Sequence, residues 1–258
     1  MKEATGEYLL LLDSDDWLEP HTLQTLADKQ NGEDMICFNG KRYFEDGREE
    51  IPDQGITEER LTGWDYYSKY ALIPRKFHFV CTVLRLYKRE FLLQNKLFFK
   101  EGILHEDNLF TPIACYFSQS VQVIPDILYT YRIREGSITQ KNSERRVQDM
   151  ITITNQLSLF FISKNGLSKK TIYNSLSDSY IDLFNWFLEI YNNDRNSLGN
   201  FYHSILWPAF YQVSESLMQI IYYHLLHKKK FNLFKILYYY NVCVFNKILR
   251  KITMLKIK

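Results

Sequence analysis

The hydrophobic and polar positions divide the chain into two parts. Before about residue 140, short apolar runs alternate with helical patterns, which is typical of an α/β protein. After it, long helical patterns follow one another, separated by Asn165-Gly166 and by Asn192-Asn193-Asp194. We therefore predict two regions: residues 1–140 with a mixed sheet and helices, and residues 141–258 that are all helical.

The first predicted strand is the apolar run Tyr8–Leu12, which polar residues flank on both sides. Its length and flanks predict a strand buried on both faces, in the middle of a parallel sheet. Such a strand needs neighbours, and a crossover helix normally precedes it. The other predicted strands are Met35–Phe44, Phe79–Tyr87 and a strand pair from Val121 to Arg132 that bends at Pro125-Asp126. Two of the predicted helices have an apolar face: one starts at Pro20, with Leu23, Leu26 and Ala27, and one contains Leu109, Phe110, Ile113, Ala114 and Phe117. Further helices are predicted at Thr57–Leu72 and 90–95 and near 143–164, 168–192, 200–227 and 231–252.

Composition changes this picture only at the end of the chain. The 258 residues are 46% hydrophobic and 24% charged, with a net charge of +2, which argues against a dedicated nucleic-acid binder. Residues 203–258 carry nine Lys and Arg against one Glu, a net charge of +8, which leaves −6 for residues 1–202. A basic, aromatic tail on an acidic body favours an anionic surface as a partner. The four isolated cysteines are typical of reduced core residues in a cytosolic protein.

An acidic turn, Asp13-Ser14-Asp15-Asp16, directly follows the first predicted strand. Side chains alternate in extended chain, so Asp13 and Asp15 point to the same side and repel each other unless a cation or water separates them. Oxygen ligands of this kind suit Mg²⁺ or Mn²⁺, which proteins hold with one or two carboxylates plus substrate phosphates. The alternative is a solvated turn whose acids cap the helix that begins near Pro20.

The segment around this turn has the sequence ATGEYLLLLDSDDWLEP, from Ala4 to Pro20. It resembles the region of the D-x-D motif in family 2 glycosyltransferases of the GT-A fold, over 17 consecutive residues. The resemblance implies that Asp13 and Asp15 face a divalent metal (Mn²⁺ or Mg²⁺) and the diphosphate of a nucleotide sugar. Asp15 is the first candidate for a direct ligand, and Asp16 is a further metal ligand, a support or a cap.

A second acidic pair, Glu106-Asp107, precedes the amphipathic helix that contains Leu109. Taken alone, the pair is typical of acids that cap a helix and favour its dipole. Family 2 enzymes carry an E-D pair at this point, and the resemblance implies that Asp107 is the general base of a single displacement with inversion. Glu106 then orients the acceptor or Asp107. We expect the helix N-terminus to lower the pKa of Asp107.

A third segment, from Leu128 to Thr139, resembles the Y-R-x-x-x-x-S-I pattern of the same family. It implies that Arg132, Arg134 and the backbone around Ser137 close over the diphosphate, because a planar guanidinium binds two phosphate oxygens at once. Many relatives carry His where Arg134 stands, so a role for this position in metal binding does not carry over. The alternative is a strand end with solvated arginines.

The tail alternates apolar or aromatic residues with basic ones, as in Lys228-Lys229-Lys230 and the residues after it. No charge-free run is long enough to span a bilayer. The pattern is typical of amphipathic helices that lie in the membrane interface, at the inner face of the cell membrane. Internal packing of the helical region and an oligomer interface are the alternatives.

Two functions follow from these observations. The first is an inverting, hexosyltransferase-like glycosyltransferase, with a UDP-sugar as the expected donor and a surface polysaccharide or lipid-linked glycan as acceptor. The second is a non-catalytic, membrane-associated remnant or interaction module. Family members begin with a strand-helix-strand unit that holds the uracil and ribose, and this chain opens close to the D-x-D motif. We therefore expect a truncated chain that turns over weakly or not at all alone.

Overall fold

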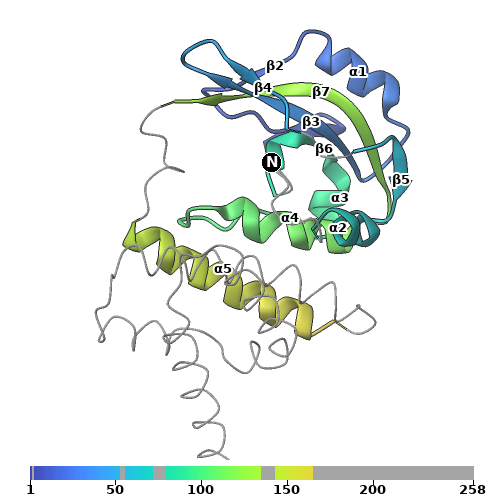
Figure 1. The fold of residues 1–258 in the computed structure, drawn as a ribbon. Coiled ribbons are helices and arrows are strands. Elements are labelled where there is room, and N and C mark those ends of the chain that lie inside the picture. Colours follow the sequence, from blue (N-terminus) through green and yellow to red (C-terminus); the bar gives the residue numbers. More distant parts are fainter. Residues whose placement is uncertain (2, 53–55, 72–79, 135–142, 165–258) are drawn as a thin grey trace, which may run out of the picture. The chain divides into compact units, whose positions relative to one another are not determined.

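The computed structural model describes residues 1, 3–52, 56–71, 80–134 and 143–164. These residues belong to one compact unit (Figure 1). The strands are β1 (Tyr8–Leu10), β2 (Trp17–Leu18), β3 (Met35–Phe44), β4 (Glu49–Glu50), β5 (Glu59–Leu61), β6 (Arg85–Lys88) and β7 (Val121–Ile133). The helices are α1 (Thr22–Lys29), α2 (Gly63–Ala71), α3 (Arg89–Gln94), α4 (Glu106–Phe117), α5 (Glu144–Ile162) and the 3₁₀ turn η1 (Thr82–Leu84).

The strands form one mixed sheet in the order β1-β6-β3-β7-β2, with β4 beside β3 and β5 beside β7. The long central strands β3 and β7 are parallel, whereas the other pairs are antiparallel. Figure 1 shows α1 on one side of this sheet and α2, α3 and α4 on the other. The predicted α/β class with a mixed sheet is confirmed for the described residues.

The first strand differs from its prediction. Instead of lying buried between parallel neighbours, β1 pairs with β6 in the antiparallel direction and forms the edge of the sheet in the described part of the chain. Its three residues are only partly buried, and Leu12 beyond it is 52% exposed. The apolar run correctly predicted a strand, but the burial of that strand depends on its neighbours in the sheet.

The core on the α1 side is built from alternate residues of the central strands. Ile36 and Phe38 of β3 pack with Leu128 of β7 and with Leu26 of α1. Thr22, one helical turn before Leu26, is also buried, and its hydroxyl donates to the carbonyls of Glu19 and Leu128, at 2.8 Å each. The predicted stripe was partly wrong, because Leu23 is 65% exposed.

The opposite face of the sheet carries α2 and α4, with α5 packed on α4. The aromatic rings of Trp64 and Tyr67 in α2 contact Phe161 of α5, with ring centroids 5.6 and 6.1 Å apart. Gly63 begins α2 at a point so close to α4 that a Cβ atom there would lie 2.1 Å from the Cys115 carbonyl. Glycine is therefore required at this contact.

Two further predictions need correction. Residues predicted as one helix from Thr57 to Leu72 form β5 followed by α2, because Glu59–Leu61 pairs with the start of β7. The predicted strand pair at Pro125-Asp126 is one 13-residue strand. Pro125 has no N–H to donate to the neighbouring strand, so β7 bulges there. The Asn39 side chain donates a hydrogen bond to the Pro125 carbonyl, at 3.0 Å.

The strand predicted at Phe79–Tyr87 is present only as β6, from Arg85, because Thr82–Leu84 forms the 3₁₀ turn η1. The remaining predictions agree with the described elements or lie outside them. Met35–Phe44, the short helix near 90–95 and the helix near 143–164 are confirmed as β3, α3 and α5. Ser143 caps α5, since its hydroxyl accepts from the Arg146 N–H at 3.2 Å. The boundary near residue 140, the later helices and the basic tail lie outside the described residues.

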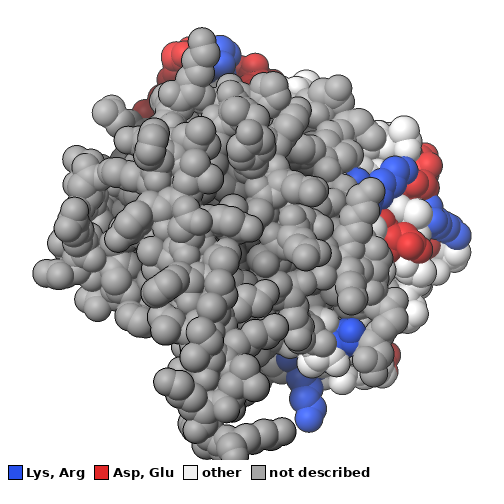
Figure 2. All heavy atoms as spheres, turned by 60° about the horizontal axis from the view of Figure 1, so that its bottom comes forward, with Lys and Arg blue, Asp and Glu red and all other residues white. Residues whose placement is uncertain are grey.

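Surface charge is mixed in the described part of the molecule. Figure 2 shows acidic and basic side chains next to one another where described residues reach the surface. Several form exposed ion pairs, such as Lys29 with Glu58 at 3.4 Å and with Asp126 at 3.5 Å. Within the same described ranges, no helix has the length and apolarity that crossing a bilayer requires.

Candidate active site

The acidic turn is tied to the far end of β7 through Asp16. The turn closes by a hydrogen bond from the Asp16 N–H to the Asp13 carbonyl, at 3.2 Å. One Asp16 carboxylate oxygen accepts from the Tyr129 hydroxyl at 2.6 Å, and the other accepts from the Arg132 N–H at 2.8 Å. The Tyr129 hydroxyl in turn accepts from the Asp13 N–H, at 3.3 Å. Two segments more than 100 residues apart are thereby held in register.

These contacts give Asp16 a supporting position. Both of its oxygens already accept hydrogen bonds, and partial burial raises its pKa although the bonds from Tyr129 and Arg132 oppose that rise. The alternative that the acids cap the next helix is not what the structure has. The residue before α1 is His21, in the left-handed region at φ 64°, and no side chain caps the helix.

Asp13 and Asp15 are the two carboxylates of the turn that face other charges. The pKa of Asp13 is raised, first by partial burial and then by the negative charges of Asp15 and Glu106. Asp15 forms an ion pair with Arg134, whose Nη2 lies 2.8 Å from Oδ2. The charge of Glu106 acts on Asp13, so the two acidic segments predicted from the sequence lie close together in space.

Glu106 and Asp107 occupy the first turn of α4. The residue before them, His105, has φ 61° and lets the chain turn sharply into the helix. One Asp107 oxygen accepts from the Asn108 N–H at 2.9 Å. The pKa of Asp107 is nevertheless raised to about 6, because burial and then the charge of Glu106 outweigh that hydrogen bond. The expected lowering of this pKa was wrong, because removing the carboxylate from water raises its pKa more than the helix N-terminus lowers it.

The pKa of the Cys81 thiol responds to charges in both acidic segments. Its thiol pKa is raised to about 12, first by burial and then by the charges of Asp107, Asp13 and Asp16. The side chain also packs at the border of the core on the α1 side. One residue thus lies within electrostatic reach of both carboxylate groups. The structure therefore brings the turn and the start of α4 to the same part of the molecule.

In the third predicted segment, Arg132 and Arg134 contact the acidic turn in different ways. Arg132 uses its backbone N–H to hold Asp16, and its side chain is exposed. Arg134 reaches back to Asp15 with its guanidinium. Ser137 lies outside the described residues. The two arginines are thus placed beside the acidic turn.

Three residues around this site escaped the sequence analysis. Tyr129 joins Asp13 to Asp16, and Cys81 lies between the acidic segments. Arg85 is only 1% exposed, and its guanidinium donates to the Cys81 carbonyl and to the Tyr66 hydroxyl. Its charge also lowers the pKa of Asp107. An arginine inside an apolar run predicted as a strand was the available signal, because charged groups are buried only when they are paired.

The donor set can be tested against a divalent metal ion. Among the described residues, no group of three or more His, Cys, Asp or Glu side chains is arranged to hold one. Mg²⁺ and Mn²⁺ need fewer protein ligands than that when substrate phosphates complete the shell. Asp13 and Asp15 provide two oxygen-bearing groups on one turn. They fit an ion that a bound diphosphate would share.

Several known glycosyltransferases are similar to this chain. The family model of glycosyl transferase family 2 matches residues 1–94. EpsH of Bacillus subtilis, named as a glycosyltransferase, is 26% identical over 71% of this chain and 53% of its own length. Glycosyltransferase GlyG of Streptococcus pneumoniae is 27% identical over 52% of this chain and 46% of its own length. The chain spans about half the length of these curated relatives.

The solved structures give the fold. The structure of TarS residues 1–349 from S. aureus in complex with UDP-GlcNAc superposes with a TM-score of 0.55 at 20% identity. The match covers 81% of this chain and 60% of that one. The chain thus resembles glycosyltransferase family 2 in residues 1–94 and shares the GT-A fold of TarS.

Proposed function

We propose that this chain carries the metal site and the acceptor side of an inverting glycosyltransferase. The observation that carries the proposal is the approach of two carboxylate groups from distant segments, since the charge of Glu106 acts on Asp13. Like charges that repel one another in a folded protein are typical of sites that bind a cation or move protons. The family match gives the reaction class.

In this proposal Asp107 is the general base. Its carboxylate takes the proton of an acceptor hydroxyl while that oxygen bonds to the anomeric carbon and the carbon–oxygen bond to the diphosphate breaks. A pKa of about 6 suits the task, because the group is ionised at neutral pH and binds a proton more strongly than an ordinary aspartate. Glu106, whose charge raises that pKa, orients the acceptor in this proposal.

The leaving diphosphate is held by the turn and the end of β7. Asp13 and Asp15 would hold a divalent ion, which supplies positive charge to the departing diphosphate when bound. In this proposal Arg132 and Arg134 contact the diphosphate, while Asp16 holds the turn against β7. Tyr129 fixes the spacing between Asp13 and Asp16.

The substrates are proposed from the relatives. TarS has been solved with UDP-GlcNAc and with UDP and is named as a poly(ribitol-phosphate) β-N-acetylglucosaminyltransferase. We therefore propose a UDP-sugar as donor and a surface glycan or lipid-linked glycan as acceptor. The basic tail supports a peripheral position at the inner face of the cell membrane. Sedimentation with anionic vesicles, compared with a chain ending at residue 202, tests that position.

The experiment for the central proposal separates binding from chemistry. UDP binding is measured by calorimetry with and without Mn²⁺, and sugar release from UDP-GlcNAc and other UDP-sugars is measured in parallel. Both are done with the chain alone and with a longer form that includes any sequence encoded directly before residue 1. We expect Mn²⁺-dependent UDP binding that D15N weakens, and turnover that D107N abolishes without weakening UDP binding.

The matched control is D126N, which removes a carboxylate from the bulge of β7, on the described surface. It should change neither quantity. A UDP affinity that neither Mn²⁺ nor D15N changes would contradict the metal site. A form that turns over equally well with D107N would contradict the assigned base. UDP binding and turnover absent from both forms would favour the non-catalytic alternative.

A further inference from the structure

One ion pair at the proposed metal site is unlike the other polar contacts there. Asp15 is a proposed ligand of the divalent ion, yet its Oδ2 lies 2.8 Å from the Arg134 guanidinium. Neither side chain is buried, since Asp15 is 32% and Arg134 is 51% exposed. The contact is therefore made by two groups that can exchange it for another partner at little cost.

The backbone holds Arg134 in this place. Two residues earlier, the Arg132 N–H is bonded to Asp16, and Tyr129 is bonded to the same carboxylate. The end of β7 is thereby fixed against the turn before the chain reaches Arg134. From this fixed point the Arg134 side chain reaches Asp15.

Electrostatic attraction favours a diphosphate over Asp15 as the partner of Arg134. Asp13 and Asp15 are two residues apart on one turn, so their negative charges repel each other. A guanidinium beside Asp15 reduces that repulsion in the same way as a metal ion would. Guanidinium groups also bind phosphate oxygens in pairs, which makes a diphosphate a better partner than a single exposed carboxylate.

We propose that Arg134 is an internal counter-ion that competes with the divalent metal for Asp15 and moves to the diphosphate when nucleotide and metal bind together. The inference rests on the proposed function of the acidic turn. Its consequence is that the metal binds weakly by itself and more tightly with nucleotide. By linkage, the metal strengthens nucleotide binding by the same factor.

The test compares R134Q with R132Q, two variants that remove one positive charge each at the same end of β7. Calorimetric titration gives the Mn²⁺ affinity of both variants and of the natural chain, with and without UDP. Loss of the ion pair should strengthen Mn²⁺ binding without UDP about two- to fivefold in R134Q relative to R132Q, the range expected for an exposed pair. UDP should strengthen Mn²⁺ binding less in R134Q than in the natural chain.

Each outcome has one meaning. Equal Mn²⁺ affinities of R134Q and R132Q, with Mn²⁺ binding measurable, would overturn the counter-ion role and leave the proposed function standing. Mn²⁺ binding that is absent from the natural chain with and without UDP would overturn the proposed function and this inference with it. Circular dichroism confirms that both variants are folded, which is expected because both side chains are exposed.

Discussion

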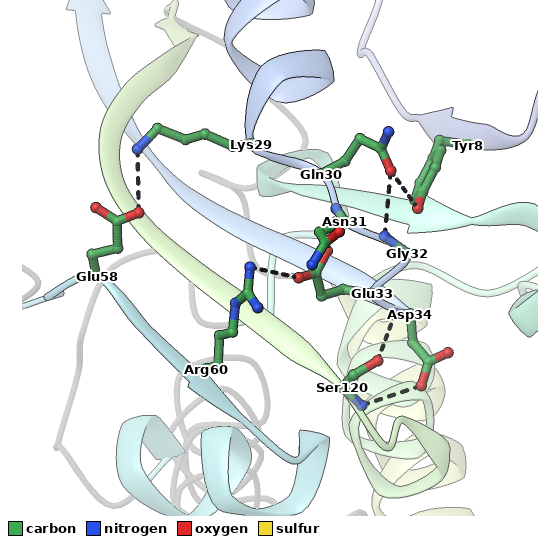
Figure 3. Close-up of polar contacts among 10 residues, drawn as sticks. All are labelled: Tyr8, Lys29, Gln30, Asn31, Gly32, Glu33, Asp34, Glu58, Arg60 and Ser120. Carbon is green, nitrogen blue, oxygen red and sulfur yellow. Dashed lines mark hydrogen bonds and ion pairs between the residues drawn. The ribbon is translucent and has the colours of Figure 1, made fainter.

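The two ends of β7 use carboxylates in opposite ways. At its start, one Asp34 oxygen accepts from the N–H groups of Gln119 and Ser120 at 2.7 and 3.3 Å and from the Ser118 hydroxyl at 3.4 Å. Beside it, the buried Glu33 accepts from the Asn31 N–H at 2.7 Å and pairs with Arg60 at 3.3 Å (Figure 3). At its other end, Asp13, Asp15 and Asp16 gather with the Glu106–Asp107 pair close by.

The difference lies in what each carboxylate faces. Asp34 accepts from N–H groups just before β7, and Glu33 pairs with Arg60 of β5, so their charges hold the start of β3 to both strands. Asp13 and Asp107 face other carboxylates, and burial together with those charges raises both pKa values. The carboxylates at one end of the strand are thus paired within the protein, while those at the other end form the proposed metal and general-base site.

The largest expected effect is on chemistry at the second end. In the form that turns over donor, Asp107→Asn should lower the rate about 100-fold or more, because a positioned general base contributes that much. Asp34→Asn removes the same charge at the first end and should leave the rate within about twofold for the folded fraction. Initial rates of sugar release measure both. Similar losses in the two variants would erase the distinction between the ends.

The pH profile should sharpen the same comparison. With the pKa of Asp107 at about 6, kcat/KM should fall tenfold per pH unit below that value as the base becomes protonated. The charge of Glu106 contributes to that raised pKa, so Glu106→Gln should move the acid limb to lower pH. Rates normalised to their own plateau isolate this shift. An acid limb that stays in place would show that Glu106 does not act on Asp107.

Stability should change in opposite directions at the two ends. Asp34→Ala leaves N–H groups without their acceptor and should lower the free energy of unfolding by about 2 kcal/mol. Asp107 has its pKa raised by folding, so the folded state binds its proton more tightly, and stability decreases as pH rises from about 4 to about 6. Asp107→Asn should therefore raise the free energy of unfolding at pH 7 by about 1 kcal/mol. Urea denaturation measures both values, and equal signs would contradict the comparison.

The smallest effect is expected between the ends, at the surface. Lys29 pairs with Glu58 and Asp126 at 3.4 and 3.5 Å, and all three side chains retain contact with water. Lys29→Ala should change the free energy of unfolding by less than about 0.5 kcal/mol, since exposed ion pairs contribute little. The same denaturation curves provide the value. A loss as large as that of Asp34→Ala would mean that surface pairs hold this sheet as strongly as the contacts at the start of β7.

By itself, the sequence determined the resemblance to glycosyltransferase family 2, the mixed α/β class and the position of β3, because these depend on contiguous patterns: a 17-residue motif and a run of apolar residues. It also picked out the acidic turn and the Glu106–Asp107 pair, since charged groups beside apolar runs are visible in one dimension. It misjudged the burial of β1, the strand at Glu59–Leu61 and the continuity of β7. Those features are decided by pairing partners that are distant in sequence.

Only the tertiary structure decided what the individual acids of the site face. Asp16 is tied to Tyr129 and Arg132, Asp15 to Arg134, and Asp13 is near Glu106, across separations of about 90 residues or more. The direction of the Asp107 pKa was likewise set by burial rather than by its place at a helix N-terminus. A residue's charge is written in the sequence, but its free energy depends on the water, dipoles and charges around it, and folding alone assembles those.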